Sequence, residues 1–346
     1  MQFKKTEDLK AGMRLARPIY NRDGVLLYER DSKLTQQGIT SIENFGLIGI
    51  FILEPAEPVP PMTKADIEFE RFQVVNVFAI KEAMQMLLAT GKKAKLDAVV
   101  ASINKSFGSL DERLNFVQNL RSKEDYVYKH ALNVAILCAM MGSQMNLKLD
   151  ERRDVITAAL ICDMKEYSIL EQVYEYYPGV RRYCQQALKI AEWVEEGRAD
   201  TTARLKNGSR ILAVAQAYDD MTAMSIDKEA PASSVIAVKY LMDKEEFYSE
   251  DIIAALVHSI SILGPGVCVE LSTGEKGLVL EENLRDFLRP VVLVFGDNTI
   301  LDFSDQYVYE DVEITDIMKT MDRRHFMGED VVKEYGFGEL KRQMKQ

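Results

Sequence analysis

The chain has 346 residues, of which 47% are hydrophobic and 28% are charged, a composition typical of folded globular proteins and a length that suits about two or three domains. Lys and Arg number 43 against 54 Asp and Glu, which gives a formal net charge of −11. These figures exclude a mainly disordered chain, and the negative charge disfavours bulk nucleic acid and anionic membrane surfaces as partners.

Residues 1–54 have the pattern of a small α+β module. Two β-prone runs, 13–20 and 25–29, flank turn residues at 21–24, which predicts a hairpin. Thr35 is placed to cap a helix over 35–44, and the run 48–54 predicts a closing strand. Residues 55–64 are rich in proline and predict a semi-rigid linker, because proline continues neither a helix nor a sheet.

From residue 65 to 264 the apolar period lies between three and four, which predicts a helical domain. Its first helical stripe consists of Ile67, Val74, Val77, Phe78, Met84, Leu87 and Leu88. We interpret this stripe as core, with a dimer seam as the alternative.

Over residues 265–346 a period of two returns and predicts a three- or four-stranded β meander, followed from Asp311 by one or two peripheral helices. The predicted fold class is therefore mainly α, with a helical core flanked by a small N-terminal α+β module and a small C-terminal β meander with a helical tail.

The cysteines and the apolar runs indicate the cellular compartment in which the chain is expected. Cys138, Cys162, Cys184 and Cys268 lie far apart without zinc-finger spacing, so they predict buried thiols in a reducing environment. The N-terminus lacks an apolar core, and no nearly apolar run is long enough to span a bilayer. We therefore expect a cytoplasmic chain.

Two blocks in the helical region carry a family resemblance. Residues 125–166 contain DYVYKHALNVA and, further on, AALICDM, and they resemble the opening of HD-GYP domains, the branch of the HD phosphohydrolase superfamily associated with cyclic di-GMP hydrolysis. Residues 209–223, SRILAVAQAYDDMTA, are similar to the late helix of that family. The residues before the proline-rich linker and the run GPGVCVELSTGEKGLVL look like modules often attached to such domains. The resemblance implies an HD-type helical core.

The resemblance also implies a metal site, but with altered ligands. Active members hold metal with a histidine, a His-Asp pair and a later aspartate, and the metal supplies hydroxide near neutral pH. The matching positions here are His130, Cys162, Asp163 and Gln216. A cysteine replaces the histidine of the pair, and an amide, a poor ligand for an iron or manganese centre, replaces the aspartate.

The family's further ligands have no counterpart. No histidine lies between His130 and His258, and the Gly-Tyr-Pro signature is missing between Asp163 and Ser209. We therefore expect no catalytic residues, no metal at these vestigial positions and no cofactor. If the helix packing of the family persists, His130 and Asp163 should lie on facing helices within a few ångströms of one another.

Other candidate residues have more ordinary interpretations. His258 and His325 are remote from acidic or cysteine clusters, which favours structural or solvated roles. Arg181 and Arg182 follow a Pro-Gly pair and could hold a phosphate, but a solvated basic face is more common. Aromatic residues that could stack on a base are more typical of core and rim positions: Tyr167, Tyr174, Tyr176, Tyr177, Tyr183 and Trp193. P-loop, dinucleotide-binding and nucleophile-elbow motifs are absent from the sequence.

The first hypothesis is a non-catalytic HD-GYP-like signalling or interaction module that has lost its metal centre and binds a protein partner. The first rival is a metal-dependent phosphohydrolase of the cyclic di-GMP phosphodiesterase type, with a rearranged site of His130, Asp163 and Cys162. The second rival is a receptor that binds a cyclic dinucleotide without cleaving it. A homodimer is left open by the sequence.

Overall fold

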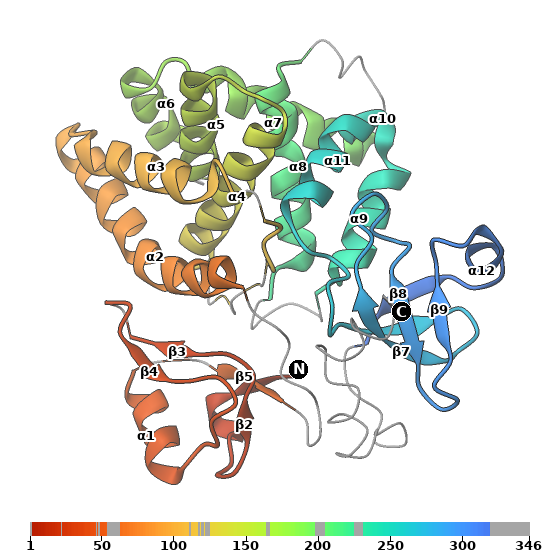
Figure 1. Ribbon diagram of the computed structural model, residues 1–346. Coiled ribbons are helices and arrows are strands. Elements are labelled where there is room, and N and C mark those ends of the chain that lie inside the picture. Colours follow the sequence, from red (N-terminus) through yellow and green to blue (C-terminus); the bar gives the residue numbers. More distant parts are fainter. Residues whose placement is uncertain are drawn as a thin grey trace. The chain divides into compact units, whose positions relative to one another are not determined.

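The structure is a computed structural model that divides the chain into two compact units. One unit is Lys64–Ser261, and the other combines Met1–Thr63 with Ile262–Gln346. The structure describes residues 2–21, 23–45, 47, 49–53, 63–110, 112–116, 118, 121, 125–163, 167–197, 205–224 and 231–318, and of residues 2, 3 and 167–169 the backbone alone. Helices predominate among these residues, so the predicted mainly α fold class is confirmed (Figure 1).

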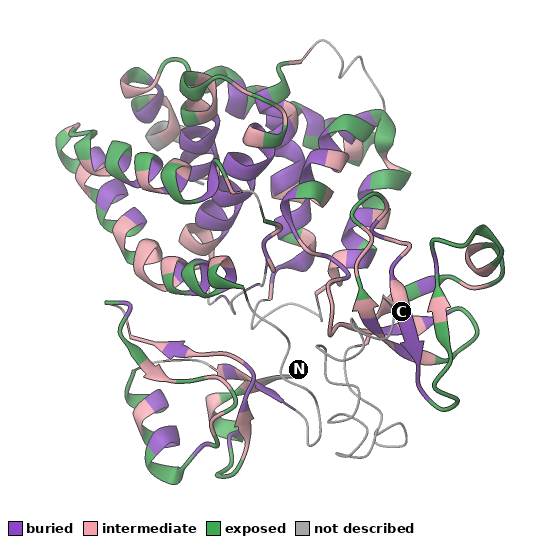
Figure 2. Ribbon diagram, viewed as in Figure 1, coloured by how far each residue is buried: buried purple, intermediate pink, exposed green. Residues whose placement is uncertain are grey.

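The unit Lys64–Ser261 is helical throughout its described elements. These are α2 (Lys64–Thr90), α3 (Ala94–Phe107), α4 (Tyr126–Gln144), α5 (Leu149–Ile161), α6 (Tyr167–Tyr176), α7 (Arg181–Glu196), α8 (Asn207–Thr222), α9 (Ser234–Asp243), α10 (Glu245–Tyr248) and α11 (Glu250–Ser259). Helix α4 lies at the centre and packs against α2, α3, α5, α8 and α11. Its residues from His130 to Gly142 are buried, and Figure 2 shows this as a purple ribbon along most of α4. Polar residues on so buried a helix need partners within the protein.

Helix α2 corrects the interpretation of the first apolar stripe. Met84 and Leu87 are buried as predicted, but Ile67 is 46% exposed and Phe78 is 58% exposed. The prediction that the whole stripe is core is therefore wrong, because the buried face of α2 is centred on Phe69 and Ile80.

Helix α2 also meets a simple criterion for a membrane span. Among the described helices it alone is long and apolar enough, by length and composition, to cross a bilayer. Core helices of soluble proteins meet the same criterion, so this is a weak indication. The expected cytoplasmic location stays a prediction.

The N-terminal part of the second unit is a small α+β module. Its elements are β1 (Gln2–Lys5), a 3-10 turn (Thr6–Asp8), β2 (Arg14–Leu15), β3 (Ile19–Tyr20), β4 (Leu26–Tyr28), α1 (Gln36–Asn44) and β5 (Gly49–Leu53). Strands β1, β5 and β2 form one sheet in that order, and β3 pairs with β4 as the predicted hairpin. The side chain of Thr35 accepts a hydrogen bond from the Gly38 N–H at 3.0 Å, so the predicted helix cap is confirmed.

The C-terminal part of the same unit is an antiparallel sheet, with one short helix between its last two strands in the sequence. Its elements are β6 (Cys268–Leu271), β7 (Lys276–Glu281), β8 (Val291–Val294), β9 (Ile300–Asp302), α12 (Gln306–Asp311) and β10 (Ile314–Ile317), and the sheet order is β10-β6-β7-β8-β9. The expectation of helix after Asp311 is wrong for Ile314–Ile317, because this segment pairs with the edge of β6. Residues 319–346, which include His325, lie outside the described residues.

Candidate functional site

Three of the four vestigial metal positions meet directly in the helical unit. His130 lies on α4, Cys162 and Asp163 follow α5, and Gln216 lies on α8. These three helices pack against one another. The Nε2 atom of His130 lies 3.0 Å from Oδ2 of Asp163, so the predicted proximity of this pair is confirmed.

The Gln216 amide engages the same carboxylate. Its Nε2 lies 3.1 Å from Oδ2 and 3.3 Å from Oδ1 of Asp163, and it donates to this carboxylate. Asp163 therefore receives an imidazole N–H on one side and an amide N–H on the other. A side chain that donates hydrogen bonds occupies the position at which the family places an aspartate.

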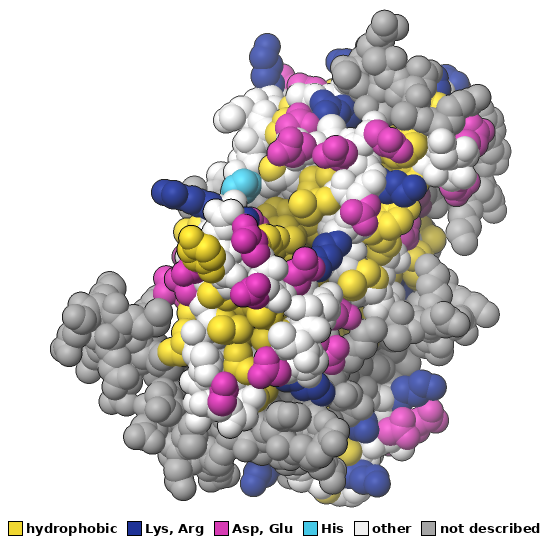
Figure 3. All heavy atoms as spheres, turned by 90° about the vertical axis from the view of Figure 1, so that its right-hand side faces the viewer, with side chains coloured by type: hydrophobic (Ala, Val, Ile, Leu, Met, Phe, Trp, Pro, Cys, Tyr) yellow, Lys and Arg dark blue, Asp and Glu magenta, His cyan; other side chains and the backbone are white. Residues whose placement is uncertain are grey.

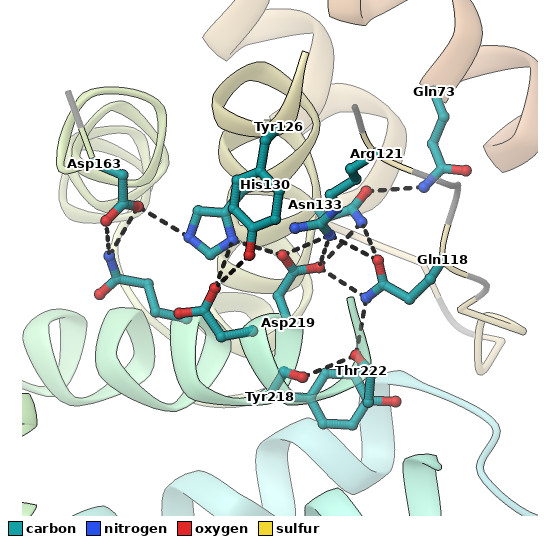
Figure 4. A network of polar contacts seen from close by, with 12 residues as sticks. Gln73, Gln118, Arg121, Tyr126, His130, Asn133, Asp163, Tyr218, Asp219 and Thr222 are labelled. Atoms are coloured by element: carbon teal, nitrogen blue, oxygen red, sulfur yellow. Dashed lines mark hydrogen bonds and ion pairs between the residues drawn. The ribbon is translucent and has the colours of Figure 1, made fainter. Parts of the chain in front are cut away.

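The other side of His130 faces two further carboxylates. Its Nδ1 lies 2.6 Å from Oδ2 of Asp219 and 3.6 Å from Oδ1 of Asp220. Figure 4 shows the imidazole between Asp163 and Asp219. Burial lowers the pKa of His130, but its hydrogen bonds and charge interactions with Asp163 and Asp219 outweigh burial and raise this pKa from 6.5 to about 10. His130 is therefore a cation at neutral pH, with a proton on each ring nitrogen.

Asp219 is the fully buried anchor of the network. Nη2 of Arg121 lies 2.7 Å from its carboxylate, and the side-chain amides of Gln118 and Asn133 donate to it at 2.8 and 3.1 Å. Burial raises the pKa of Asp219, but the charges of Arg121 and His130 outweigh this effect and lower the pKa to about 2. The buried Asp219 carboxylate thus pairs with Arg121 and shares His130 with Asp163, so that two cations meet two carboxylates, as buried charges require.

Arg121 is itself 0% exposed. Its guanidinium lies 5.1 Å from the centroid of the Tyr126 ring, and this ring stacks on His130 at a centroid distance of 6.1 Å. The Nε and Nη1 atoms of Arg121 have no hydrogen-bond partner among the residues that the structure describes. Asp219 is therefore its main compensating group there.

Amide side chains extend the network to neighbouring helices. Gln118 donates to Thr222 on α8 at 2.9 Å, and Gln73 on α2 donates to Asn133 on α4 at 2.8 Å. The network therefore joins α2, α4, α8 and the segment before α4, which favours a structural role for it.

The outer edge of the network is acidic. The side chains of Asp163 and Asp220 are 32% and 55% exposed, whereas His130 and Arg121 lie behind them. The Tyr126 hydroxyl donates to Asp220 at 3.1 Å. Burial and the neighbouring carboxylates of Asp219 and Asp163 raise the pKa of Asp220, against the opposite effect of His130.

Cys162, the fourth vestigial metal position, is a protonated thiol. Its side chain is hydrogen-bonded with Cys184, and this bond and burial raise the pKa of Cys162 well above its ordinary value. A thiol binds metal as the thiolate, so a raised pKa opposes coordination. Within the described part of the chain, no group of three or more His, Cys, Asp or Glu side chains is arranged to hold a metal ion. The donor set does not fit the metal that the resemblance implies.

The remaining candidates lie apart from this network. His258 is exposed, and its Nδ1 lies 2.7 Å from the carbonyl oxygen of Ala254. Arg181 pairs with Glu171 at 2.9 Å. Trp193 is 5% exposed. On the face shown in Figure 3, acidic side chains are interspersed with basic and apolar ones, and the described residues there form no continuous basic stripe.

Sequence reasoning missed most of the network. Asp219 could have been found, because it lies three residues after Gln216 in the quoted block and so shares its helical face. Gln118 and Arg121 lie in an irregular segment that has no periodic signal. Their roles depend on contacts that only the folded chain reveals.

Comparison with known proteins gives one distant similarity. No family model and no solved structure matches the chain. The chain is 23% identical over 252 residues to a cyclic di-GMP phosphodiesterase of Pseudomonas aeruginosa. The match covers 64% of this chain and 59% of that protein, so the chain spans less than two thirds of the length of its relative. This similarity supports a relationship to HD-GYP proteins and nothing finer.

Proposed function

We propose that this chain is a non-catalytic signalling module related to HD-GYP proteins, in which an internal ion-pair network has replaced the metal centre. One observation carries the proposal. Both ring nitrogens of His130 face carboxylates, and the Asp163 carboxylate accepts the Gln216 amide. The groups that would bind a metal are thus bound to one another.

The pKa of His130 gives part of the free energy that metal binding would cost. A metal requires a neutral imidazole with an available lone pair. With a pKa of about 10, removing the extra proton near pH 7 costs about 4 kcal/mol. The Gln216 amide would also have to leave Asp163. These costs oppose binding before any ligand geometry is considered.

The acidic edge argues against a cyclic dinucleotide at this position. A phosphate approaching from solvent would meet Asp163 and Asp220 first, while the cations of His130 and Arg121 are buried and already paired. Like charges at the entrance repel the ligand. A protein partner therefore fits better than a nucleotide, and the module would signal through binding alone.

The test combines turnover with metal content. The purified chain is assayed with added Mn²⁺ or Fe²⁺ against cyclic di-GMP, its linear product and an aryl phosphodiester, and we expect no hydrolysis. A Cys162→His/Gln216→Asp double variant restores the ligand types and serves as the control. After loading and desalting, elemental analysis should find metal in the double variant and none in the natural chain.

Two results would contradict the proposal. The first is metal-dependent turnover by the natural chain that disappears in a His130→Ala variant, which would restore the phosphohydrolase hypothesis. The second is tight binding of cyclic di-GMP by the metal-free chain that is lost in His130→Ala, which would favour the receptor.

A further inference from the structure

Helix α2 carries an exposed stripe with the spacing of a helix-pairing seam. The stripe, called the α2 seam below, consists of Ile67, Arg71, Val74, Phe78, Lys81 and Gln85. Successive members are alternately four and three residues apart, which is the spacing of a coiled-coil contact line. All are exposed except Val74, which is partly buried.

The opposite face of α2 is already fixed to the helical unit. Phe69 is 0% exposed and its ring packs edge-on against Phe107 and at a tilt against Phe116. Gln73 bonds to Asn133 on α4. The α2 seam therefore cannot turn into its own core. Only 28% of the most apolar 18-residue stretch of α2 is buried, so the helix presents much apolar surface.

We propose that the exposed face of α2, made of the α2 seam and the flanking residues Glu68, Val75 and Glu82, binds the same face of a second copy of this chain in an antiparallel arrangement. A two-fold axis between Val74 and Val75 places Val74 against Val75 of the other copy. It places Arg71 opposite Phe78, where a guanidinium can stack on an aromatic ring. Such an interface uses the same surface on both copies, as two-fold dimers require.

The charges of α2 select this orientation. In the same register Glu68 faces Lys81 of the other copy, so opposite charges meet on both sides of the axis. In a parallel pair Arg71 would face Arg71 and Lys81 would face Lys81, and like charges destabilise such a pair. The charge pattern is therefore complementary to itself only when the helices run in opposite directions.

The charged groups are available for this contact. Glu68 lies 3.7 Å from Lys64, and these side chains are 66% and 89% exposed, so their pair contributes little in the free chain. Lys81 is exposed, with its Nζ 5.9 Å from the Tyr128 ring centroid. A single helix pair forms a small interface, so we expect a dimer that dissociates on dilution.

The first experiment is sedimentation velocity of the full chain from low to high micromolar concentration. We expect the natural chain to shift from monomer to dimer, and Phe78→Glu to stay monomeric with an unchanged circular dichroism spectrum. Phe45→Glu is the matched control, because Phe45 is 51% exposed in the N-terminal module and Phe78 is 58% exposed. This variant should still dimerise. A natural chain that is monomeric throughout, or equal effects of both substitutions, would overturn the proposal.

Charge exchange tests the pairing without removing an apolar group. Glu68→Lys alone and Lys81→Glu alone should each weaken the dimer, and the double variant should recover it because opposite charges face each other again. Failure of the double variant to exceed both single variants would exclude this register.

Crosslinking tests the direction of the helices. A short bismaleimide should join two copies of Val75→Cys, which lies beside the axis, but not two copies of Ile67→Cys, which faces Glu82. The natural chain treated alike gives the background from its own thiols. Efficient crosslinking of Ile67→Cys would indicate a parallel pair and refute the arrangement. None of these readouts depends on metal or nucleotide binding.

Discussion

Replacement of Asp219 by Asn is expected to destabilise the helical unit by about 3 kcal/mol. Asp219 is 0% exposed and forms ion pairs with two buried cations, Arg121 and His130. The lowering of its pKa from 3.8 to about 2 corresponds to about 2 kcal/mol of stability near pH 7. Removing one member of a buried ion pair costs about 3–5 kcal/mol in other proteins. Asn retains an acceptor oxygen, which places the expected loss near the lower value.

The assay is urea unfolding near pH 7 followed by the fluorescence of Trp193, the one tryptophan of the chain, which is buried on α7. Asp220→Asn is the control, since the neighbouring Asp220 side chain is 55% exposed. It should change the free energy of unfolding by less than about 1 kcal/mol. Equal losses for both variants, or a loss below about 1 kcal/mol for Asp219→Asn with an unchanged urea dependence, would refute the reasoning.

Three further predictions follow from the same contacts. Because the pKa of His130 rises from 6.5 to about 10 on folding, its contribution is complete below about pH 6.5 and is lost as pH rises through 10; the free energy of unfolding should fall over this interval, and His130→Gln should flatten the slope. Asp163→Asn should cost about 1–2 kcal/mol, measured by urea unfolding, with no change in phosphodiesterase activity, since it leaves His130 with one partner fewer. Gly208→Ala should lower the unfolding temperature at a cost of about 1–3 kcal/mol, because a Cβ there would collide with Val155 and lie 2.7 Å from Tyr183.

The sequence predicts the parts of this structure that local patterns control. A period near 3.6 locates the helical region, and the position of Thr35 predicts its cap. The contact between His130 and Asp163 is expected from the family resemblance, and the structure places the two side chains 3.0 Å apart. The helical region and the cap need only local patterns, whereas the His130–Asp163 contact needs the resemblance as well.

The other features depend on tertiary contacts that a single sequence does not encode locally. Periodicity identifies apolar residues on α2 but cannot decide that Phe69 faces the core while Phe78 faces outward. Arg121 donates to the Gln118 amide three residues earlier, but its charge is compensated by Asp219, which lies far along the chain on α8. Strand β10 has only four residues, Ile-Thr-Asp-Ile, and it forms because β6 offers an edge to pair with.

The central claim, that His130 is a cation held by carboxylates and not a metal ligand, can be measured by nitrogen NMR of the imidazole groups. The chain has three histidines, His130, His258 and His325, so His→Gln variants assign each signal. Near pH 8, well above the ordinary histidine pKa, we predict that both ring nitrogens of His130 carry protons and that excess Zn²⁺ leaves their signals unchanged. A neutral His130 imidazole at this pH, or a signal that shifts in proportion to added Zn²⁺, would contradict the account.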